Sequence, residues 1–141
     1  MKISIYQVDA FTSKVFKGNP AAVCPLKEWL PDEVMQKIAQ ENNLSETAFF
    51  INKEDSFDIR WFTPVSELDL AGHPTLATAH VIIEELNFKS DKIIFKTKIG
   101  DTLNVTKKNN LFLMDFPSRP PKIYDNIELV SDALRKKPLA L

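Results

Sequence analysis

Residues 72–86, GHPTLATAHVIIEEL, decide the fold. Pro74 suits the first position of a helix, where its fixed φ and missing N–H are tolerated, and His73 is then the N-cap. From Leu76 to Ile83, small and apolar residues lie on every side of the helical wheel. A surface helix shows a single apolar stripe, so this pattern predicts a helix enclosed on all sides.

Segments typical of β-strands lie on both sides of this helix in the sequence. Before it, residues 2–10, 21–24, 46–51 and 57–62 predict strands, and a helix begins near residue 31 and ends near residues 42–43. After it come predicted strands at residues 93–97, 102–106 and 111–116, then a short amphipathic helix at 127–134. We therefore predict an α+β domain in which a curled, mostly antiparallel sheet wraps the apolar helix.

Composition narrows the class of protein. The 141 residues include 18 basic and 19 acidic side chains, a formal net charge of −1, which provides no broad attraction to nucleic acid. The single cysteine, Cys24, rules out an intrachain disulfide, and no apolar run is long enough to span a bilayer. We expect a cytoplasmic protein with no nucleic-acid or membrane partner.

Glu46 is the first candidate for chemistry. It stands at the start of a predicted strand, beside the apolar run Ala48 to Ile51. A carboxylate in such surroundings is a candidate for a desolvated acid or base. The alternative from the residues alone is an ordinary exposed glutamate at a strand edge.

The segment Gly72, His73, Pro74 and Thr75 is the second candidate. A helix start offers free backbone N–H groups and the positive end of the helix dipole, which suit a carboxylate, and an imidazole can carry a proton. The alternative is a tight turn into a helix, with no ligand.

Other reactive side chains are interpreted as structural. His80 is expected in or near the core, Cys24 as a small buried hydrophobe, and Glu67 and Asp69 as solvated loop charges. Two histidines without a third ligand at fixed spacing predict no metal site, and three glycines form no phosphate-binding loop.

The order of several short motifs adds a resemblance. Residues 8–12 (VDAFT), 18–23 (GNPAAV), 43–49 (NLSETAF), 62–64 (FTP) and 67–75 (ELDLAGHPT) follow one another along the chain. This succession resembles the N-terminal half of the PhzF-like (phenazine biosynthesis-like) isomerase family over roughly residues 3–118.

The resemblance implies a diaminopimelate epimerase-like fold, with two related domains and an active site in the cleft between them. It implies that Glu46 is the acid/base that moves a proton between carbons of a small carboxylic acid, without metal or organic cofactor. Gly72, His73, Pro74 and Thr75 would bind the substrate.

The second domain of the family has no counterpart in this sequence. We expect residues 1–120 to form the N-terminal domain and residues 121–141 to connect toward a second domain that is absent. The chain alone is expected to be inactive, and to pair with itself as a homodimer. A two-thiol epimerase is disfavoured, because Ala71 and His73 flank Gly72 where that chemistry needs a cysteine. The alternative from another class is a noncatalytic module that binds small molecules or self-associates.

Overall fold

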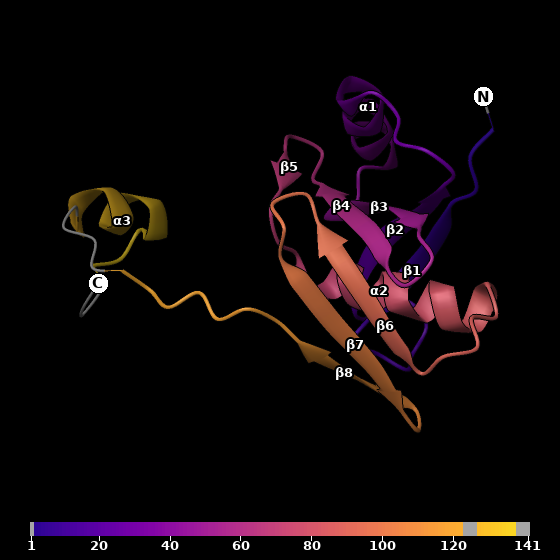
Figure 1. Ribbon diagram of the computed structural model, residues 1–141. Helices are drawn as coiled ribbons and strands as arrows, with labels where there is room; N and C mark the ends of the chain where they lie inside the picture. The colour runs from indigo at the N-terminus through magenta and orange to yellow at the C-terminus, as the bar shows by residue number, and fades with distance from the viewer. Residues whose placement is uncertain (1, 123–126, 138–141) are drawn as a thin grey trace.

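The computed structural model describes residues 2–122 and 127–137, and these ranges contain one eight-stranded sheet, helices that cover it and a further helix apart from it (Figure 1). The strands are β1 (Tyr6–Ala10), β2 (Asn19–Leu26), β3 (Glu46–Asn52), β4 (Phe57–Phe62), β5 (Glu67–Leu68), β6 (Lys92–Thr97), β7 (Thr102–Lys108) and β8 (Leu111–Asp115). The helices are α1 (Asp32–Asn42), α2 (Gly72–His80) with a π-helical turn at Val81–Glu85, and α3 (Ile127–Leu134). The predicted connection at 121–141 lies partly outside the described residues.

The strand order is β1-β2-β3-β4-β6-β7-β8, with the short β5 beside β4. Most neighbours are antiparallel; β2 with β3 and β4 with β6 are parallel. A parallel pair needs a crossover connection, and α1 and α2 provide the two crossovers. The prediction of a mostly antiparallel sheet is confirmed.

The sheet curls around α2, which lies against its concave side (Figure 1). The main core joins small residues of this helix, such as Ala77 and Ala79, to large side chains of the sheet, such as Trp61 and Phe95. Two buried threonines of α2 satisfy their hydroxyls within the helix: Thr75 donates to the Ala71 carbonyl and Thr78 to the Pro74 carbonyl. The other face of the sheet is covered by α1, whose Met35 and Ala39 are buried.

Two predictions about α2 are wrong. The helix begins at Gly72 with Ala71 as its N-cap, so His73 is its second residue and Pro74 its third. The helix is also not enclosed on all sides, because Leu76, His80 and Ile83 are only half-buried. The reason is that the sheet does not close: β1 and β8 are its two edge strands, and one side of α2 lies between them.

The helix predicted at residues 127–134 is confirmed as α3, which lies apart from the sheet in Figure 1. None of its residues is buried. Within the described ranges, no helix combines the length and apolar character needed to cross a membrane.

Candidate active site

Glu46 is the first residue of β3, and a tight connection places it there. The helix α1 ends at Asn42, and Asn43 turns the chain with a left-handed φ of 50°. Asparagine tolerates this conformation better than most residues. The Asn42 side-chain amide then donates a hydrogen bond of 3.0 Å to the hydroxyl of the buried Thr47. Glu46 therefore lies between the end of α1 and the rest of β3, which pairs with β2 on one side and with β4 on the other.

His73 is positioned by the start of α2. Ala71, the N-cap, has an extended backbone and no capping side chain. The amides of Gly72 and His73 belong to the first turn, whose N–H groups have no intrahelical partner, and Pro74 has no N–H at all. This end of α2 thus presents an imidazole and the first-turn amides of Gly72 and His73.

Glu46 and His73 meet across the 27 positions that separate them in sequence. The distance from Glu46 Oε2 to His73 Nε2 is 3.1 Å, and the two side chains are 17% and 11% exposed. Both atoms are buried, and neither makes a well-directed hydrogen bond. The arrangement places a carboxylate, which can accept a proton, against an imidazole, which can carry one. Each of the two atoms can still form a hydrogen bond to a third group.

The other predicted binding residues divide into two kinds. Gly72 is half-buried, and a side chain built on it would meet only the Phe116 ring, 3.9 Å away. Pro74 and Thr75 are buried, and the Thr75 hydroxyl is engaged with the Ala71 carbonyl. The structure therefore brings His73 and Glu46 together, with Gly72 next to His73 in the first turn of α2, while Pro74 and Thr75 lie in the core.

A groove of about 980 Å³ runs along the open side of α2, and its lining begins one helical turn after His73, at Leu76. His73, Leu76, Ala77 and His80 lie on one face of the helix, because residues three, four and seven apart share a face. Leu76, Ala77 and His80 line the groove with residues of β1, the loop after it, and β8. His80 is half-buried, as predicted, and packs edge-on against Phe112. Sequence patterns could not reveal this groove, because it depends on where the sheet fails to close.

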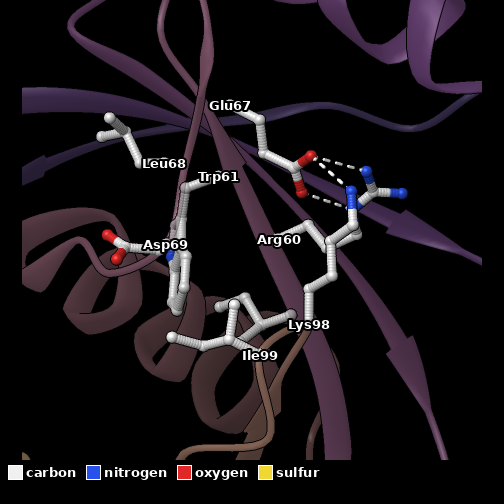
Figure 2. Close-up of a pocket in the computed structure, with 8 residues that line it drawn as sticks. Arg60, Trp61, Glu67, Leu68, Asp69, Lys98 and Ile99 are labelled. Carbon is white, nitrogen blue, oxygen red and sulfur yellow. Dashed lines mark hydrogen bonds and ion pairs between the residues drawn. The ribbon is translucent and has the colours of Figure 1, made fainter.

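Sequence reasoning also missed an ion-pair cluster around Arg60, and the prediction of Glu67 as a solvated loop charge is wrong. Glu67 begins β5 and accepts two hydrogen bonds from Arg60, at 2.7 and 2.8 Å (Figure 2). Asp32 and Lys98 complete the cluster. Burial pushes the pKa of Glu67 upward, but the bonds from Arg60 and Lys98 outweigh it and hold this pKa below its ordinary value.

The Arg60 cluster lies on the α1 side of β4, where the guanidinium also stacks on Trp29 and Phe62. Trp61, the next residue, points the opposite way into the main core. A hollow of about 250 Å³ beside the cluster is lined by Trp61, Leu68 and Ile99 among others (Figure 2). Since the cluster's charges are paired with one another, we assign it to stability. Asp69 is exposed, as a loop charge should be, and pairs with Arg119.

Comparison with known proteins identifies the family of the chain. The family model described as phenazine biosynthesis-like protein matches residues 8–136. A Pseudomonas aeruginosa protein named an uncharacterized isomerase is 51% identical over 122 residues, which cover 86% of this chain and 47% of that protein.

Solved structures match in shape. A PhzF-family protein of Enterococcus faecalis superposes with a TM-score of 0.81 at 47% identity, covering 94% of this chain and 51% of that one. A predicted epimerase of Pseudomonas aeruginosa gives a TM-score of 0.64 at 25% identity, over 79% of this chain and 41% of its own. The epimerase-like fold predicted from the sequence is confirmed. The chain spans about half the length of these relatives, and it belongs to the phenazine biosynthesis-like (PhzF) family.

Proposed function

We propose that this chain carries one wall of the active site of an isomerase that moves a proton between carbons of a small carboxylic acid. The observation that carries the proposal is the contact of 3.1 Å between Glu46 Oε2 and His73 Nε2, both buried and without another hydrogen-bond partner. The name isomerase, borne by a relative that is 51% identical, supports the reaction class.

In this proposal Glu46 is the acid/base. Its Oε2 removes a proton from one carbon and returns it to another, so that one carboxyl group serves both half-reactions. A reaction of this kind depends mainly on holding the reacting carbon close to the base, and it needs neither metal nor organic cofactor.

The start of α2 supplies the substrate-binding half of the proposal. The amides of Gly72 and His73, at the positive end of the helix dipole, would hold the substrate carboxylate. His73 Nε2, at 3.1 Å from Glu46, would orient the acid/base or carry its proton between the two half-reactions.

The opposite wall of the site would come from a second domain. The relatives contain about as many residues again as the part that this chain matches. We propose that residues 1–120 are the N-terminal domain and that the segment from residue 121 leads toward that second domain. The free thiol of Cys24 is compatible with a reducing cytoplasm, where we place the protein.

The test is a chimera in which residues 1–120 replace the matching half of the Pseudomonas aeruginosa relative. Small unsaturated carboxylic acids, including a dihydro-hydroxyanthranilate, are incubated with it in D2O, and both the isomerised product and deuterium at each carbon are followed by NMR. Exchange that is lost in Glu46→Gln while ligand binding persists supports the enzyme. Binding with neither isomerised product nor exchange in the unmutated chimera supports the noncatalytic module instead.

A further inference from the structure

The chain that follows β8 contacts the connection between β5 and α2 at two points. The Phe116 ring is half-buried, packs against the main core and lies 3.9 Å from the position that a Cβ on Gly72 would occupy. Three residues later, Arg119 Nη1 donates a hydrogen bond of 2.9 Å to Asp69 Oδ2. Asp69 in turn lies three residues before Gly72. The segment 116–119 is therefore held against the approach to the candidate active site.

The start of α2 lacks the side-chain cap that often fixes a helix end. Ala71 is the N-cap, and its methyl group accepts no hydrogen bond from the first turn. Residues 69–71 belong to neither a strand nor a helix. The Thr75 hydroxyl bonds to the Ala71 carbonyl from inside the helix, whereas within residues 2–122 and 127–137 the Asp69 carboxylate bonds only to Arg119. Arg119 therefore holds the outer side of this connection.

We propose that Arg119 is a positioning residue, which through Asp69 holds the start of α2 in its binding geometry. The inference rests on the proposed function, in which the amides of Gly72 and His73 bind the substrate carboxylate. The contact itself can be measured without any substrate. Arg119 also stands directly before the segment that leads toward the second domain, so the same contact would relate the position of that domain to the position of the binding amides.

The surroundings of Asp69 explain why its position depends on Arg119. The guanidinium fork fixes direction as well as distance, and its second nitrogen makes only a longer contact, 3.4 Å to Asp101. Asp69 also lines the hollow of about 250 Å³, together with Trp61, whose buried Nε1–H has no acceptor (Figure 2). A carboxylate released by Arg119 has both space and an alternative donor there, and its movement would carry the connection to α2 with it.

The contact is tested first in the 141-residue chain, without substrate, by the ¹H and ¹⁵N shifts of the Gly72 and His73 amides. Arg119→Met keeps an unbranched apolar stem and removes the charge, and Asp69→Asn removes the charge of the partner. Each change should move both amide signals. The double variant should move them no further than either single change, because all three variants lose the same contact.

Lys107→Met is the matched control. It breaks another partly exposed ion pair, with Glu84 at the far end of the same helical segment, and should leave the Gly72 and His73 signals in place. The Tm of Arg119→Met should match that of the parent, because an ion pair as exposed as this one stabilises a fold little. The proposal is overturned by amide signals that do not move in Arg119→Met, or by a double variant whose shifts are the sum of the two single changes.

The consequence for binding is measured in the chimera, which includes Arg119. Arg119→Met should raise KM by about fivefold or more and leave kcat nearly unchanged, because it displaces the binding amides and not Glu46. Lys107→Met should change neither constant. A KM that stays at the parent value in Arg119→Met would overturn the positioning role. A chimera with no turnover at all would contradict the proposed function instead, and the amide shifts of the 141-residue chain then decide the positioning role on their own.

Discussion

Glu46 and His73 face each other at 3.1 Å although one begins a strand and the other lies in the first turn of a helix. Their contact depends on two separate pieces of backbone, the connection from α1 into β3 and the start of α2. Substitutions in either segment should therefore change the contact between the two side chains without replacing Glu46 or His73.

The bond from Asn42 to Thr47 should stabilise the protein and fix Glu46. Asn42→Ala leaves the Thr47 hydroxyl buried without a partner and should lower the free energy of unfolding by about 1–2 kcal/mol. Adding Thr47→Val should cost less than the two single changes summed, because both lose the same bond. Urea unfolding of the four proteins measures this, and additive losses would contradict it.

The Asn42→Ala variant should also change the contact between Glu46 and His73. In Asn42→Ala the ¹⁵N shift of His73 Nε2 is expected to change, since Glu46 is no longer held against it. Thr97→Val is the matched control, because it removes a bond of 3.0 Å that the buried Thr97 hydroxyl accepts from the Asp101 amide, in the turn between β6 and β7. A shift that moves equally in both variants would show a general loosening instead.

Arg60 should confer stability that depends on pH. Arg60→Met leaves Glu67 without its bidentate partner and should cost about 2–3 kcal/mol near neutral pH, less than a fully buried pair because Glu67 is 23% exposed. Hydrogen bonding to Arg60 lowers the pKa of Asp32, and the bonds to Glu67 outweigh its burial and lower its pKa too.

The sign of this pH dependence follows from linkage. Carboxyl groups whose pKa is lower in the folded state stabilise it above their unfolded pKa values, about 4.5 for Glu67 and 3.8 for Asp32. That contribution is lost as the pH falls through the lower folded-state values. The difference in stability between parent and Arg60→Met should therefore shrink below about pH 4, as urea titrations at several pH values can measure. A difference that does not change with pH would contradict the assignment.

Cys24 should be inert in the folded protein. Burial raises the pKa of its thiol to about 12, so near pH 8 only about one molecule in 10⁴ carries the reactive thiolate. Labelling by a thiol reagent should be at least about a thousandfold slower in buffer than in denaturant. Rapid labelling of the folded chain would show that β2 opens locally.

The sequence was sufficient for most elements of the fold. The alternation of apolar residues and the turn residues between strands predicted seven of the eight strands, and β5 was missed because a two-residue strand has no period. The start of α2 was misplaced by two residues, because proline is tolerated at several positions of a first turn where no N–H is needed. The open side of α2 depends on which strands end the sheet, and helical periodicity does not contain that information.

The site was less predictable from local patterns. Taken one at a time, Glu46 and His73 were each compatible with a structural role, and no helical or strand period connects residues 27 positions apart. Only the order of the family motifs suggested that they act together. The role of Glu67 was missed because its partner, Arg60, becomes a neighbour only when β5 turns back along β4.

The 141-residue chain alone should show little or no isomerase activity. One wall of a site leaves the substrate in contact with water, and the groups that a second domain would contribute are missing. Turnover assays of the purified chain, compared with the chimera that supplies the second half, measure this. Appreciable turnover by the chain alone would contradict the half-site interpretation.

The most direct test of the central claim is the rate at which the chimera incorporates deuterium at substrate carbon, compared between two glutamate variants. Glu46→Gln keeps the shape of the side chain but removes its base, and the rate should fall by at least about a hundredfold. Glu41→Gln, a change at an exposed position of α1, should leave it unchanged. A Glu46→Gln chimera that exchanges deuterium as fast as the parent would show that Glu46 is not the acid/base.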